Sequence, residues 1–173
     1  MTARPPEAWL RGPVDGIAPV LQPAAHALIQ ASEELAAAVA GLPVATVWAG
    51  PGGVASIGFH LRHIAASTDR LLAYARGAPL SAEQLRELAE EKAPGTPPAE
   101  APALLAHAHA RMHAALDAYR AVDNGILFEP RTVGRKRLPT TVFGLLAHIG
   151  EHAMRHTGQV VTTAGIMRAQ RLD

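Results

Sequence analysis

The sequence predicts an all-α protein, and its composition, its helical periodicity and the placing of its glycine and proline breaks lead to that prediction. Hydrophobic residues make up 49% of the 173 residues and charged residues 18%, as in a folded globular protein. Alanine and leucine, both strong helix formers, supply most of the apolar content. Apolar residues recur at helical spacing in four long segments. We therefore expect a four-helix bundle in a single domain that spans residues 1–173.

The first segments are an irregular arm and a long helix. Residues 1–16 are rich in proline and glycine, so we expect them to form an irregular N-terminal arm. The first helix is expected to begin at Pro19 or Pro23, because proline suits the first helical turn, where its missing N–H costs nothing. This helix should run to about Ala40.

A break at residues 49–53, which include three glycines and a proline, separates the first helix from the second. Ser56 is a suitable N-cap for the second helix, which should end near Gly77. Residues 81–91 are rich in charged side chains and predict a short, exposed helix.

The second half of the chain predicts two further long helices. One is expected over residues 99–122. Residues 126–139 carry β-branched side chains around Gly134, a pattern that indicates a small hairpin or a folded loop. Pro139 and Thr140 should then open the fourth and longest helix, which is expected to reach about Gly165.

Charge and composition exclude several classes of function. The formal net charge is +1, without the excess of basic residues that is typical of nucleic-acid-binding proteins. The chain has no cysteine, which excludes disulfides, thiolate metal sites and a cysteine nucleophile. The N-terminus lacks the pattern of a signal peptide, and no run of about 18 apolar residues predicts a membrane span. We therefore expect a cytoplasmic protein with neither nucleic-acid nor membrane partners.

Histidine is the unusual feature of the composition, and one group lies on the predicted fourth helix. His152 and His156 are four residues apart, so on a helix their imidazoles can point at one position. His148 lies one turn earlier, and Gln159 lies between His148 and His152 around the helix axis. An isolated pair of this kind is most simply a pair of surface or cap histidines, so further ligands are needed to indicate a metal site.

The predicted second helix supplies His60 and His63. A catalytic zinc-type centre takes three protein ligands, and in a bundle these come from facing helices. One of the two histidines is therefore a candidate third ligand. Periodicity leaves the choice between them open, with His60 nearer the centre of the apolar stripe.

Other candidates are weaker. His109 and His113 are also four residues apart, but His109 is more simply a partly buried, hydrogen-bonded histidine and His113 a surface one. Glu151 is a candidate acid–base group, but it is adjacent to His152 in sequence and so points about 100° away from it around the helix, which argues against that role. The basic run 135–137 is most simply a solvated loop; if it folds over the metal, it would bind the anionic part of a substrate or cofactor.

Two segments resemble motifs of a known family. Residues 56–65 (SIGFHLRHIA) resemble the second-helix motif of the DinB-like (damage-inducible, YfiT-like) superfamily. Residues 148–159 resemble the H-x-x-x-H-x-x-Q motif on the last helix of that family. The order and lengths of the predicted helices agree as well, so the resemblance extends over nearly all of the chain after its first fifteen residues.

The resemblance implies a bundle with one long crossover connection and a three-histidine site for a divalent metal, Zn, Ni, Fe or Mn. Matched positions give His63, His152 and His156 as the ligands, and His60, His148 and Gln159 as second-shell or substrate-contacting neighbours. Characterised members use small thiols such as bacillithiol or mycothiol, and members are often dimers. The implied function is a metal-dependent thiol S-transferase or a related enzyme acting on a small molecule. A non-catalytic metal-binding stress-response protein and a metal-dependent hydrolase are the alternatives.

Overall fold

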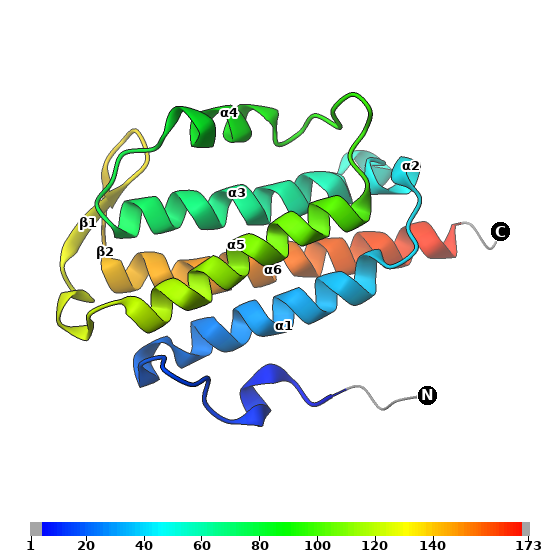
Figure 1. Cartoon of the computed structure of the whole chain (residues 1–173). Helices are drawn as coiled ribbons and strands as arrows, with labels where there is room; N and C mark the ends of the chain where they lie inside the picture. The colour runs from blue at the N-terminus through cyan, green and yellow to red at the C-terminus, as the bar shows by residue number, and fades with distance from the viewer. Residues whose placement is uncertain (1–4, 171–173) are drawn as a thin grey trace.

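The computed structural model describes residues 5–170, which form a mostly helical fold with one small two-stranded sheet (Figure 1). The sequence-based expectation of a mostly helical protein is thereby confirmed. The long helices are α1 (Gln22–Val39), α3 (Ile57–Ala75), α5 (Ala101–Ala121) and α6 (Val142–Ala169).

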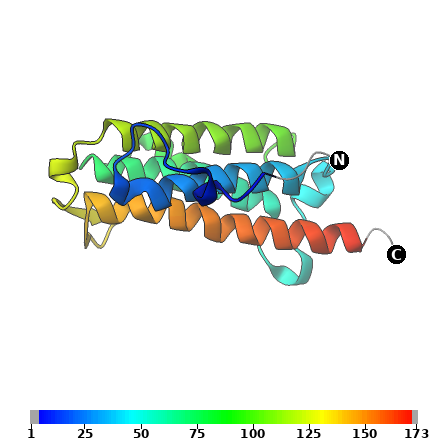
Figure 2. The ribbon, with the colours of Figure 1, turned by 90° about the horizontal axis from the view of Figure 1, so that it is seen from below.

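The four long helices lie side by side in both views of the ribbon (Figures 1 and 2). Helix α6 packs against α1 and α3, and α5 packs against the same two helices. The core therefore lies between the four helices, and each contributes one apolar stripe to it. Its fully buried side chains include Leu28, Leu35, Leu61, Ile64, Met112, Tyr119, Ile149 and Val160.

Local capping signals set the starts of two helices where the sequence predicts them. The hydroxyl of Ser56 accepts a hydrogen bond from the backbone N–H of Phe59 at 3.1 Å, which caps α3. Ser81 and Gln84 form a capping box at the start of α4 (Ala82–Glu90), a short helix that packs against α3.

The start of α6 differs from the prediction. Pro139 and Thr140 belong to β2 (Leu138–Thr141), which pairs antiparallel with β1 (Pro130–Val133). The helix therefore begins two residues later, capped by Thr141, and it continues to Ala169 rather than ending near Gly165. The predicted hairpin is confirmed, and it lies at the end of the long helices where α6 begins (Figure 1).

The remaining elements are short. The N-terminal arm contains a single 3-10 turn at Ala8–Arg11, and residues 1–4 of the predicted arm lie outside the described residues. Helix α2 (Val44–Val47) follows α1 and is not predicted from the sequence. Further 3-10 turns lie at Pro19–Leu21, Pro51–Gly53 and Asn124–Ile126.

A close approach between α1 and α6 depends on a glycine. A Cβ atom at Gly150 would lie 2.8 Å from the carbonyl oxygen of Ala24 and 2.9 Å from its Cα, so no larger residue fits without separating the helices. Gly150 lies two residues before His152, so this contact fixes the depth at which the histidine-bearing part of α6 packs.

No helix within residues 5–170 combines the length and the apolar character that a membrane span requires.

Candidate metal centre

The two histidine groups of the sequence meet at the interface between α3 and α6. The two helices run in opposite directions, so the earlier histidine of one faces the later histidine of the other. Nδ1 of His60 lies 2.8 Å from Nδ1 of His156, and Nε2 of His63 lies 2.9 Å from Nε2 of His152. Helix packing therefore brings together residues that are about ninety positions apart in the chain.

Three of these histidines form a cluster of the size that a metal ion needs. His63, His152 and His156 each offer one ring nitrogen, and the three nitrogens all lie within 4.8 Å of one another. Ligand nitrogens around a tetrahedral zinc ion, bound at 2.0–2.1 Å, are about 3.3 Å apart. The cluster consists of the three residues that the family resemblance implies as ligands.

The donor set also fits a metal. Three imidazoles suit several divalent transition metals and leave a coordination position for water or substrate. Nδ1 of His152 is buried and has no hydrogen-bond partner among residues 5–170. A buried polar atom of this kind needs a partner, which an ordered water molecule would supply, while Nε2, the nitrogen that faces His63, stays available to a metal.

Burial keeps two of these rings neutral at physiological pH. Burial, followed by the effect of the nearby His63, lowers the pKa of His152 to about 4 and that of His156 to about 3. The pKa of His60 is lowered for the same reasons, burial first and His63 second. Neutral imidazole is the form that binds metal, so the rings of His152 and His156 are already in the form that a metal would require.

A buried carboxylate, which sequence reasoning missed, holds His63. Oε2 of Glu91 lies 2.8 Å from Nδ1 of His63, and Oε1 lies 2.8 Å from a guanidinium nitrogen of Arg70. Burial alone would raise the pKa of Glu91, but the hydrogen bonds with His63 and Arg70 outweigh it and lower the pKa. The ionised carboxylate keeps the proton of His63 on Nδ1 and directs Nε2 toward the cluster.

The expected exposure of residues 81–91 is therefore wrong at Glu91, which is only 5% exposed. The residue lies just after α4, where the chain turns inward against α3. A charged segment of this composition normally faces solvent, and no local pattern distinguishes Glu91 from the other glutamates around it.

The predicted neighbours of the ligands are placed differently from one another. His60 is buried and hydrogen-bonded to His156, so it is positioned to orient that ring. His148 is half-exposed, with its ring centroid 5.1 Å from that of His152 and its Nδ1 2.7 Å from a carboxylate oxygen of Glu151. Gln159 is exposed, and no hydrogen bond of its side chain is found in the described part of the chain.

An aromatic wall closes one side of the cluster. The ring of Phe59 stacks on His63, with centroids 5.3 Å apart and an angle of 20° between the planes. It also meets His156 edge-on at 6.5 Å. Phe59 excludes water from one face of the His63 ring, which strengthens the electrostatic interactions beside it.

The weaker candidates lie elsewhere. Nε2 of His109 is 3.0 Å from the carbonyl oxygen of Ser32, and His113 is exposed, as expected of structural histidines. The hairpin with the basic run 135–137 lies by Tyr74, eleven residues beyond His63 and therefore about 16 Å along α3. The interpretation in which this loop covers the metal is not supported by that placement.

A family model for the DinB superfamily matches residues 3–160 of the chain. The matched range includes the histidines of α3 and of α6. Among curated proteins, no significant match is found.

Proposed function

The chain belongs to the DinB superfamily, and from that premise we propose that it binds one divalent metal ion through His63, His152 and His156. The convergence of these imidazoles within 4.8 Å carries the proposal. As part of it, the four long helices form the bundle with one long crossover that is implied for the family, in a single domain of residues 1–173.

The surroundings of the cluster support a resident metal rather than a chance contact. Neutral rings are required for binding, and the lowered pKa values of His152 and His156 meet that requirement. The hydrogen bond between His63 and Glu91 matches the carboxylate–histidine pair found behind many metal ligands. Imidazole ligands suit Zn, Ni, Fe and Mn, so the donor set does not choose among them.

We further propose a metal-dependent thiol transferase that acts on a small electrophilic substrate. A bound divalent metal lowers the pKa of a coordinated thiol or water and so favours the nucleophilic form at neutral pH. The chain contains no cysteine, so a small thiol such as bacillithiol or mycothiol would supply the sulfur.

His148 is the residue placed to accept a proton in that reaction. Its Nδ1 is held by Glu151, so Nε2 stays free, and its ring is a neighbour of His152 on the solvent side of the cluster. The same arrangement favours the second candidate, a metal-dependent hydrolase, because a water nucleophile also needs a general base.

Metal analysis of full-length protein purified without a histidine tag tests the metal site. We expect about one ion per chain, and loss of that ion in His63→Ala, His152→Ala and His156→Ala. His109→Ala is the matched control, because His109 forms its hydrogen bond with Ser32 instead. Full occupancy in all three cluster variants would refute the assignment.

A thiol screen then tests the reaction. Cobalt-substituted protein is mixed with bacillithiol, mycothiol, glutathione or coenzyme A, and a thiol that binds the metal should change its absorption spectrum. Metal-dependent transfer of the same thiol to an electrophile would support the transferase. If no thiol binds at millimolar concentration, the non-catalytic metal-binding stress-response protein becomes the better description. Homodimerisation stays a prediction.

A further inference from the structure

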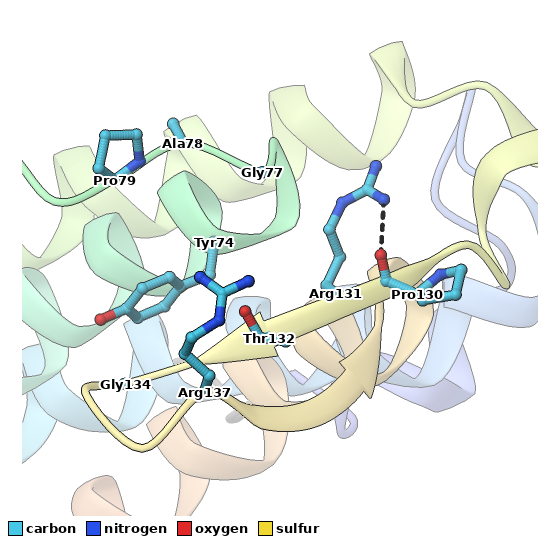
Figure 3. A pocket seen from close by; sticks show the side chains of 9 residues that line it. All are labelled: Tyr74, Gly77, Ala78, Pro79, Pro130, Arg131, Thr132, Gly134 and Arg137. Carbon is cyan, nitrogen blue, oxygen red and sulfur yellow. Dashed lines mark hydrogen bonds between the residues drawn. The ribbon is translucent and has the colours of Figure 1, made fainter.

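A cavity of about 500 Å³ lies between the C-terminal end of α3 and the β1–β2 hairpin (Figure 3). Tyr74 and Gly77 form its wall on the α3 side, and Thr132, Arg131 and Arg137 form its wall on the hairpin side. Tyr74 and Thr132 both line the hollow, so an aromatic side chain and a hydroxyl-bearing one lie within it.

The cavity carries an excess of positive charge. Arg131 is fixed in place, because its Nε donates to the carbonyl oxygen of Ala75 at 2.9 Å and it also pairs with Glu129. Arg137 forms no ion pair within residues 5–170, and its guanidinium lies beside Tyr74 and Thr132 in Figure 3. None of the residues that line the hollow in the described structure is acidic. The guanidinium of Arg137 is therefore available to an anion.

The backbone at Arg137 adds an independent observation. Its φ of 49° lies in the left-handed region, and it is the only residue other than glycine with a positive φ between residues 5 and 170. A long side chain disfavours this conformation, which costs free energy that a glycine would not lose. Strained backbone of this kind is concentrated at functional positions. Here it occurs at the residue whose guanidinium lies beside Tyr74.

We propose that this cavity binds a small oxyanion, a carboxylate or phosphate group attached to a flat apolar body. The Arg137 guanidinium pairs with the anionic oxygens through two parallel hydrogen bonds, and the hydroxyl of Thr132 adds a third. The apolar body packs on the ring of Tyr74. The cavity lies about 16 Å along α3 from His63, so a small molecule bound here does not reach the histidine cluster. The inference is thus independent of the proposed metal site.

Calorimetric titration of the full-length chain with four probes tests the proposal: inorganic phosphate, acetate, phenyl phosphate and benzoate. These probes separate the phosphate group from the carboxylate group, and each group alone from the same group with an aromatic body. We expect the aromatic member of at least one pair to bind, and to bind several-fold more tightly than its small partner. Arg137→Gln should weaken that binding at least tenfold.

Arg135→Gln is the matched control. This variant removes the same charge from the same turn, but Arg135 does not line the cavity. The affinity of the variant for the aromatic anion should therefore stay within twofold of the wild-type affinity. Absence of binding by all four probes, or equal losses in the two arginine variants, would overturn the proposal. His152→Ala should bind the anion as tightly as the wild type does. Wild-type protein that binds the anion but no metal would refute the metal site alone.

Discussion

Glu91 places a buried carboxylate oxygen 2.8 Å from Nδ1 of His63, although the two residues lie on different elements. The second oxygen of the same carboxylate lies 2.8 Å from a guanidinium nitrogen of Arg70, which is two turns of α3 after His63. The connection between α3 and α5 is thereby tied to the candidate metal centre by a charged pair inside the protein. Because Glu91 orients the ring of His63, replacing Glu91 should weaken metal binding.

Glu91→Gln should weaken metal binding by about 10- to 100-fold, as is usual when the partner behind a ligand is lost. The amide cannot hold the Nδ1 proton of His63 as an ionised carboxylate does, and it leaves Arg70 without its buried partner. Competition with a chelator of known affinity measures the effect. Glu90→Gln changes an exposed neighbour of the same type and should leave the affinity unchanged. Equal affinities for the two variants would contradict the assigned role.

His148→Gln should lower the turnover of thiol transfer by roughly 100-fold, the size of effect that general base catalysis commonly provides. Metal occupancy should not change, because His148 is not one of the three clustered ligands. Steady-state kinetics together with metal analysis separate these two effects. His113→Gln, on the exposed face of α5, serves as the control. If His148→Gln loses the metal together with the activity, His148 has a different role from the one proposed.

Gly150→Ala should destabilise the fold by about 1–3 kcal/mol, the usual cost of overpacking. The added methyl group would meet the backbone of Ala24 at 2.8 Å, and backbone atoms cannot rotate away as a side chain does. Gly165→Ala, in the same helix, has no atom within 4 Å of the added methyl and should instead stabilise by about 0.5–1 kcal/mol. Urea denaturation measures both variants, and a Gly150→Ala protein as stable as the wild type, or more stable, would show that α1 and α6 are not in such close contact.

Tyr119 makes the stability depend on alkaline pH. Its hydroxyl donates a hydrogen bond to the carbonyl oxygen of Leu146 at 2.8 Å, and burial raises its pKa well above the usual value. Above the ordinary tyrosine pKa of about 10, the unfolded chain loses the phenol proton while the folded chain keeps it. The free energy of unfolding must therefore fall as the pH rises through that range.

Tyr119→Phe should remove that part of the pH dependence, at a cost of about 1 kcal/mol at neutral pH for the lost hydrogen bond. Urea denaturation of both proteins between pH 8 and about 11 makes the comparison. Curves that stay parallel throughout this range would show that Tyr119 does not contribute to the alkaline loss of stability.

Local signals in the sequence are sufficient to predict most helix boundaries. The hydroxyls of Ser56 and Ser81 cap their helices because a cap involves only residues within one turn of it. Pro139 and Thr140 show where such signals fail. They favour a helix start, but pairing with β1, a segment seven or more residues away, holds them in a strand. Their conformation depends on a partner strand that local propensity does not take into account.

The sequence by itself determines that His152 and His156 share one face of a helix, because helical geometry follows from their spacing alone. It also places His60 and His63 together on a second helix. Only the tertiary structure decides which of these rings meet, since the antiparallel packing of α3 on α6 sets His63 against His152 and His60 against His156. The same holds for Glu91. Its burial beside His63 results from the path of the chain after α4, and this path depends on contacts between segments that are distant in the sequence.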